Sequence, residues 1–133
     1  MQDTIEKFGP LLGRILIALL FLLSGFGKIT GFAGTAGYMA SKGIPMAELL
    51  LTITIVIELG GALMIIAGFK ARLAALALFL WMIPVTFIFH NFWAMPADQA
   101  MIQQIMFMKN LSIMGAMLYI AAFGSGPMSV DKK

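Results

Sequence analysis

Glu58 and Lys109 are the residues whose types and positions most directly suggest chemistry, because each lies inside a long apolar run. Glu58 falls within residues 47–69 and Lys109 within residues 102–123. A charge in the hydrocarbon of a bilayer is costly, so such residues are paired, neutralised or turned toward a polar interior. An intramembrane pair can relay protons or clamp a ligand. The alternative, a structural ion pair that fixes the register of two helices, is left open.

Depth along the helices favours Lys109 as the partner of Glu58. Glu58 lies about eleven residues from either end of its run, hence roughly 16 Å deep, and Lys109 lies roughly 10 Å below the opposite surface. Small residues beside both, Gly61 and Ser112 among them, would let the two helices approach. Arg14 is the second choice, because its side chain can extend to the nearby head groups instead.

Three further residues are candidates for the same polar interior or its rim. His90 is a candidate to bind a quinone carbonyl or to donate a proton near neutral pH, and the alternative is a hydrogen-bonding anchor at the membrane surface. Asn110 follows Lys109 by 100° around the helix and is expected to bond to a different helix. Trp93 is typical of an aromatic belt at the membrane surface.

Four apolar segments must position these side chains. The sequence predicts transmembrane helices over residues 10–29, 47–69, 73–89 and 102–123, with a short interfacial helix over residues 36–42. Arg14 and Lys28 bracket the first helix on one face, roughly 21 Å apart, and that face is expected to turn inward. Pro84 is expected to bend the third helix. The predicted fold is all-α, a single four-transmembrane-helix bundle over residues 1–133.

Composition agrees with a membrane protein and excludes several other classes. Of the 133 residues, 61% are hydrophobic and only 11% are charged, against roughly 25% charged in a typical soluble domain. The chain has no cysteine, which rules out disulfides and thiolate metal sites, and no metal site is expected. The net charge of +3 is small and scattered, whereas nucleic-acid binding needs a clustered basic face.

Charge asymmetry predicts the orientation in the membrane. Four spans place both termini on one side, together with five basic residues: Lys7, Lys70, Arg72, Lys132 and Lys133. The other side has Lys28 and Lys42. Because basic residues concentrate on the cytoplasmic side, both termini are expected in the cytoplasm, with the protein in a bacterial inner membrane.

Several short motifs, taken in order, make the chain resemble the DoxX family of small four-helix membrane proteins. They are Arg14 with Ser24-Gly25 and Lys28, Gly43-Ile44-Pro45, Glu58-Leu59-Gly60-Gly61, Arg72, His90 with Phe92-Trp93, Lys109-Asn110, and Gly124, Gly126-Pro127 and Ser129-Val130-Asp131. Members of the family are linked to a thiosulfate:quinone oxidoreductase and to an oxidative-stress membrane complex. More distant relatives act as assembly chaperones or cargo receptors.

The resemblance and the buried charges together lead to two hypotheses about function. In the first, the chain is an accessory membrane subunit whose polar site binds a quinone or another lipid-soluble ligand. In the second, it is a non-catalytic scaffold or assembly factor for another membrane protein. Independent catalysis is not expected, because no nucleophile–base constellation is present. The expected partners are the lipid bilayer, a membrane or redox protein, and a second copy of the chain.

Overall fold

Helices account for nearly all of the chain in the computed structural model, which describes residues 1–132. The elements are α1 (Gln2–Thr30), α2 (Phe32–Ser41), α3 (Ala47–Ala67), α4 (Ala71–Phe89), the 3₁₀ turn η1 (Phe92–Ala94) and α5 (Ala97–Phe123). The four long helices α1, α3, α4 and α5 are long and apolar enough to cross a membrane. The predicted all-α bundle of four transmembrane helices is therefore confirmed.

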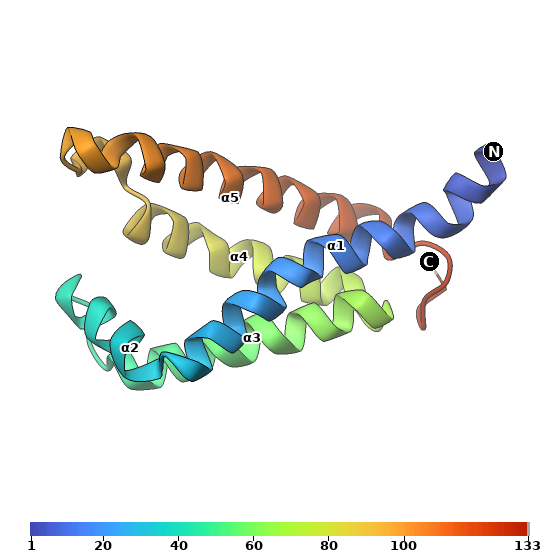
Figure 1. The fold of residues 1–133 in the computed structure, drawn as a ribbon. Coiled ribbons are helices and arrows are strands. Elements are labelled where there is room, and N and C mark those ends of the chain that lie inside the picture. Colours follow the sequence, from blue (N-terminus) through green and yellow to red (C-terminus); the bar gives the residue numbers. More distant parts are fainter. Residues whose placement is uncertain (133) are drawn as a thin grey trace.

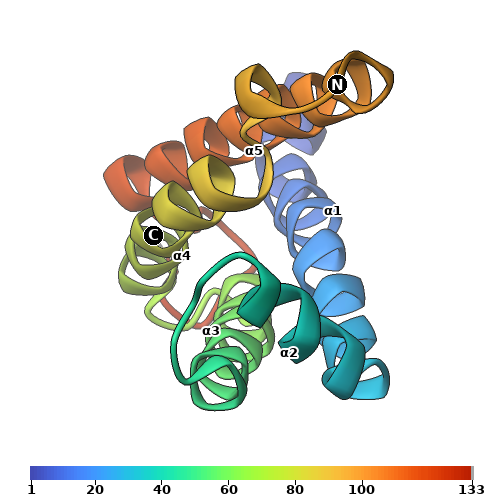
Figure 2. The same ribbon diagram turned by 90° about the vertical axis from the view of Figure 1, so that its left-hand side faces the viewer.

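Neighbouring helices form a row rather than a closed ring. α1 packs against α3, α3 against α4, and α4 against α5. α1 and α5 diverge toward the end of the bundle that lies away from the termini (Figures 1 and 2). Both chain ends lie at the opposite end of the bundle (Figure 1). The short helix α2 packs against α3 at the end of the bundle where α1 and α5 diverge.

Close packing between helices depends on small residues at the contacts. Gly25 of α1 lies under Leu59 of α3, where an added Cβ would come within 2.7 Å of the Leu59 side chain. Gly61 of α3 likewise faces Leu78 of α4, not α5 as the sequence suggested. The buried core continues along all four long helices and includes Ala18, Phe21, Ala62, Ile65, Ala75, Leu78, Met82, Met114 and Met117. Lipid provides no hydrophobic driving force for helices to associate, so their association depends on close packing. Small residues allow the backbones to approach closely enough for this.

The helices extend beyond the apolar runs from which they were predicted. α1 begins at Gln2 rather than at Pro10, and Pro10 lies inside it. Proline inside a helix removes one backbone hydrogen bond, and its ring crowds the carbonyl four residues earlier, here that of Glu6. α5 begins at Ala97 rather than at residue 102, because the polar residues before the apolar run complete its first turn. α2 covers residues 32–41. Pro84 lies inside α4, and the bend expected there stays a prediction.

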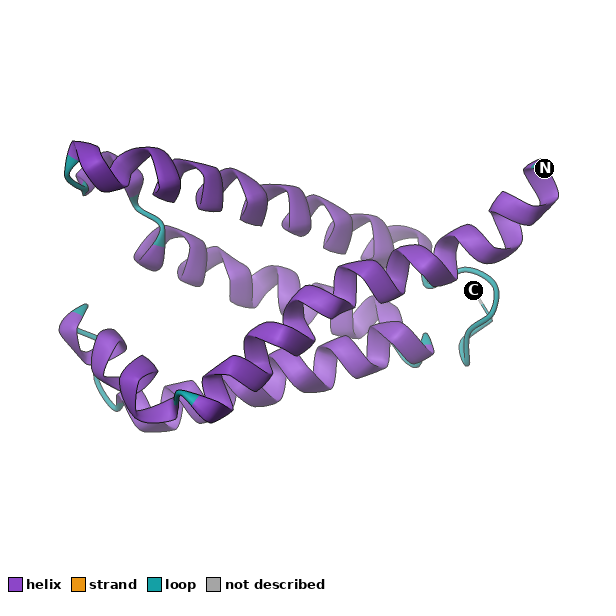
Figure 3. Ribbon diagram, in the orientation of Figure 1, coloured by secondary structure: helices purple, strands orange, loops and turns teal. Residues whose placement is uncertain are grey.

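The segment after Phe123 is the longest non-helical stretch of the described chain, and it packs across the ends of α1, α3 and α4 (Figure 3). Backbone amides of Val130 and Asp131 donate to the carbonyls of Ala67 and Gly68, at 2.9 and 2.8 Å. The Asp131 carboxylate accepts hydrogen bonds from the backbone amides of Lys70 and Ala71, both at 2.9 Å. It thereby caps the N-terminus of α4, whose first amides have no partner within the helix.

Candidate functional site in the membrane interior

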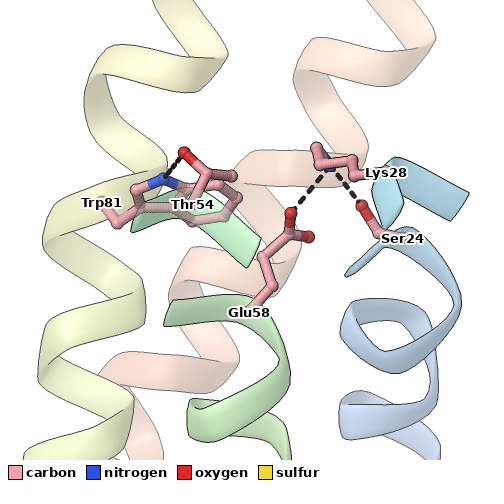
Figure 4. A network of polar contacts seen from close by, with 5 residues as sticks. All are labelled: Ser24, Lys28, Thr54, Glu58 and Trp81. Atoms are coloured by element: carbon pink, nitrogen blue, oxygen red, sulfur yellow. Dashed lines mark hydrogen bonds and ion pairs between the residues drawn. The ribbon is translucent and has the colours of Figure 1, made fainter. Parts of the chain in front are cut away.

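Glu58 forms an ion pair with Lys28, not with Lys109 or Arg14. Lys28 Nζ lies 2.7 Å from Glu58 Oε1 and also donates to Ser24 Oγ at 2.6 Å (Figure 4). The Glu58 side chain is 2% exposed and that of Lys28 is 26% exposed. The prediction that Lys109 neutralises Glu58 is wrong, and so is the second choice, Arg14.

The order of the helices explains this correction. α3 packs between α1 and α4, whereas α5 packs against α4, so the helix that lies directly against Glu58 is α1, which carries Lys28. Lys28 lies near the end of α1, where sequence reasoning placed it at the membrane surface. Side chains on a helix tilt toward its N-terminus. The Lys28 ammonium therefore reaches back by one turn to Ser24 and down to the carboxylate.

A polar cavity of about 140 Å³ lies beside this ion pair. All four long helices contribute to its wall, and five of the seven predicted site residues line it: Lys28, Glu58, His90, Lys109 and Asn110. Most of these side chains were predicted to face the interior of the bundle, from their depth in the membrane and their position around the helix. The structure brings them together around one space, although it pairs them differently.

The hydrogen bonds at the wall leave donors and acceptors unused. A lysine ammonium carries three N–H donors, and Lys28 directs two of them at Ser24 and Glu58. An ionised carboxylate has about four acceptor sites, so Glu58 keeps acceptor capacity beyond its ion pair with Lys28. The side-chain contact of Lys109 is a weak one, from Nζ to the sulfur of Met106 at 3.5 Å.

Two further polar residues are held in place by neighbours outside the ion pair. Asn110 Nδ2 donates to Thr86 Oγ1 at 3.1 Å, which confirms that it bonds to a helix other than its own. This bond occupies one of the two N–H groups of the amide. His90 Nδ1 lies 2.7 Å from Gln103 Oε1. When Nδ1 carries the proton of that bond, Nε2 of the neutral ring is an acceptor.

Two predicted site residues lie outside the cavity. Arg14 is buried at 3% exposure near the other end of the bundle. Its guanidinium donates to the carbonyls of Ser125 and Met128 at 2.6 and 2.8 Å, with longer bonds of 3.4 Å to those of Pro127 and Ile66. These contacts give Arg14 a structural role, because they join α1 to the C-terminal segment and to α3. The side chain of Trp93 is 58% exposed in a cluster of edge-packed rings with Phe87, Phe92 and Phe107.

Sequence reasoning missed two residues of the site. Trp81 lines the cavity, and its indole N–H donates to Thr54 Oγ1 at 3.3 Å (Figure 4). A tryptophan in mid-helix has no charge to mark it as part of a polar site. Ser24 could have been found, since its position four residues before Lys28 places both on one face of the helix.

The chemistry of the wall suits a small ligand that is rich in hydrogen-bond acceptors. Lys28, Lys109 and Asn110 offer N–H groups, and the two cations favour a group that carries or develops negative charge. An engineered apolar cavity of comparable size, about 150 Å³, holds one benzene ring. Among residues 1–132, no cluster of three histidine or acidic side chains could hold a metal ion.

Comparisons with known proteins agree on one family. A family model described as DoxX matches residues 9–91. The chain is 39% identical to the inner membrane protein YphA of Escherichia coli, over 92% of this chain and 88% of that protein. It is 40% identical to the inner membrane protein YqjF of the same organism, over 96% of this chain and 93% of that one.

A more distant match is eukaryotic. The chain is 29% identical to a Surfeit locus protein 4 homolog of Schizosaccharomyces pombe, and the match covers 96% of this chain but 38% of that protein. No solved structure matches the fold.

Proposed function

The chain belongs to the DoxX family and is a multi-pass inner-membrane protein, and from this premise we propose that it binds the ring of a lipid-soluble quinone. Binding takes place in the cavity bordered by Lys28 and Glu58, and the protein serves as an accessory subunit in redox metabolism. The observation that carries the proposal is the cavity itself. A purely structural ion pair would be packed on every side, whereas this one borders about 140 Å³ of polar space.

A quinone ring fits both the size and the chemistry of that space. Its two carbonyl oxygens are acceptors, and the wall offers N–H donors on opposite helices, from Lys28 on α1 and from Lys109 and Asn110 on α5. When a redox partner protein transfers two electrons to the bound quinone, its oxygens gain negative charge and then take up two protons. The ammonium groups would stabilise the negative charge, and the His90 ring would relay a proton to the quinone oxygen.

Tryptophan fluorescence tests quinone binding directly, because the chain has two tryptophans and one of them lines the cavity. A short-chain benzoquinone titrated into the purified protein in mild detergent should quench Trp81 with a saturable dependence. The Trp93→Phe variant should keep this saturable quenching, and the Trp81→Phe variant should lose it. Equal quenching in both variants, rising linearly with quinone concentration, would mean partition into the micelle and would overturn the proposal.

Mass spectrometry of the protein extracted from its native membrane separates this proposal from the scaffold hypothesis. A quinone retained in about one-to-one ratio with the chain supports the ligand-binding role. A stable protein partner retained without any quinone favours the scaffold or assembly factor instead. A second copy of the chain as the retained partner would indicate a homo-oligomer.

We further propose that both termini lie in the cytoplasm. Both chain ends lie at one end of the bundle (Figure 1). Lys70, just before α4, and Arg72, in its first turn, lie beside the C-terminal segment at that end. At the other end Lys28 is paired with Glu58, which leaves Lys42 as the cation without an ion pair among the described residues there. Lys133, which was counted in the same asymmetry, lies outside the described residues. The imbalance supports an inward orientation of the terminal end.

A further inference from the structure

A second cavity lies under α2, directly beside the polar one. Its volume is about 250 Å³. It shares four residues with the polar cavity: Lys28, Trp81, Val85 and His90. The two spaces are therefore adjoining chambers. We refer to them as the polar chamber and the α2 chamber.

The α2 chamber differs in character from its neighbour. α2 contributes Thr35, Tyr38 and Met39, and the floor includes Leu51 of α3 and Phe89 of α4. Met39 and Leu51 belong to a small hydrophobic core that holds α2 on α3. The hydroxyl of Thr54 accepts a hydrogen bond from the indole N–H of Trp81 at 3.3 Å.

Aromatic contacts close the α2 chamber on the side of α2. Tyr38 is about half exposed, and its ring centroid lies 5.7 Å from that of Phe89. Lys42 Nζ lies over the same tyrosine ring at 5.7 Å from its centroid. Together with the apolar contacts of Met39 and Leu51, these contacts hold α2 over the chamber.

From the adjoining chambers we propose that the α2 chamber binds the apolar substituent of the ligand whose ring occupies the polar chamber. The inference rests on the proposed function and deepens it, because it defines the ligand class as a ring with acceptor groups and a short branched hydrocarbon arm. A volume of about 250 Å³ is larger than the roughly 150 Å³ cavity that holds one benzene ring, but too small for a long chain. Recognition would extend over the ring and the first isoprenoid unit.

Two probes distinguish the chambers. One is a dimethoxy-methyl-benzoquinone without a side chain, and the other is the same ring with one isoprenoid unit, both measured by Trp81 quenching. In the wild-type protein the isoprenoid quinone should bind at least about tenfold more tightly than the bare ring, since burying several apolar carbons is favourable. Equal affinities for the two quinones would overturn the inference while leaving the proposed function intact.

Filling the α2 chamber should abolish this preference. Thr35→Phe places a ring in the chamber from α2, and it should weaken the isoprenoid quinone about tenfold while changing the affinity of the bare ring less than about twofold. Thr52→Phe makes the same change on α3 at an exposed position and is the matched control. Thr35→Leu is a smaller filling change that keeps the test valid if Thr35→Phe does not fold.

The outcomes separate the two proposals. A preference that survives both fillings, in variants whose thermal unfolding matches that of the wild type, contradicts a role for the α2 chamber. If neither probe quenches Trp81, the proposed function is overturned, and the inference is overturned with it. Loss of the preference in Thr35→Phe alone, with Thr52→Phe unchanged, supports both.

Discussion

The stability of the site at the level of single residues depends on Lys28 and Glu58 together. The Lys28→Met substitution leaves a buried carboxylate without its cation, and removing one partner of a buried pair costs about 3–5 kcal/mol. We therefore expect a clear fall in the thermal unfolding temperature in mild detergent, followed by circular dichroism. Lys109→Met is the matched control, since that lysine lines the same cavity without an ion pair.

The double variant, Lys28→Met with Glu58→Gln, completes this test. It removes both charges and should recover most of the stability lost in Lys28→Met. It should still fail to bind the quinone, because the cation at the polar chamber is gone. If Lys109→Met destabilised the protein as strongly as Lys28→Met, the ion pair described here would not be the one that neutralises Glu58.

At the level of elements, Gly68 ends α3 and allows the C-terminal segment to pack over it. Its φ is +69°, and an added Cβ would overlap the Cβ of Ser129. A non-glycine residue in the left-handed region costs about 1–3 kcal/mol, and the overlap adds to this. Gly68→Ala should therefore lower the unfolding temperature. Gly60→Ala is the matched control, because no atom lies within 4 Å of a Cβ added there. It should leave stability unchanged or slightly raised, since alanine favours helix.

The cap that Asp131 provides to α4 is a second element-scale feature. Asp131→Ala removes the acceptor of two backbone amides, and loss of a capping side chain costs about 1 kcal/mol. Hydrogen exchange at Lys70 and Ala71 should accelerate in this variant. Asp98→Ala is the matched control. Asp98 lies in the first turn of α5, whose N-cap residue, Pro96, provides no side-chain cap, so exchange at Lys70 and Ala71 should not change in this variant. Unchanged exchange at Lys70 and Ala71 in Asp131→Ala would show that the carboxylate does not hold the start of α4.

At the level of the whole molecule, the orientation in the membrane can be tested because the chain has no cysteine of its own. Gln2→Cys marks the terminal end of the bundle and Ser41→Cys marks the opposite end. In intact cells, a maleimide that reaches the periplasm but not the cytoplasm should label Ser41→Cys and should label Gln2→Cys only after lysis. The reverse pattern would place the termini on the outer side.

Sequence reasoning identified the spans but not the neighbours of each helix. Continuous apolar runs reveal transmembrane helices because the bilayer requires about 20 such residues for each. They do not tell which helix lies beside which, so depth alone paired Glu58 with Lys109 when α1 in fact lies against α3. Five of the predicted residues do line the polar chamber. They share one property that can be read from the sequence, which is a polar group inside or at the end of an apolar helix.

The packing of the C-terminal segment could not be predicted for a similar reason. Its residues carry no periodic pattern, and only the structure shows that its carbonyls receive the guanidinium of Arg14. Arg14 lies more than a hundred residues earlier in the chain. Local sequence therefore gives no sign of the contact.

This contact has a consequence for how the protein is made. Arg14 enters the membrane with the first helix, while most of its carbonyl acceptors lie in residues 125–128 and are synthesised more than a hundred residues later. Until then its described acceptors are reduced to the carbonyl of Ile66. An unsatisfied cation in the membrane is costly, so the first helix reaches its final environment around Arg14 only after residues 125–128 have been added to the chain.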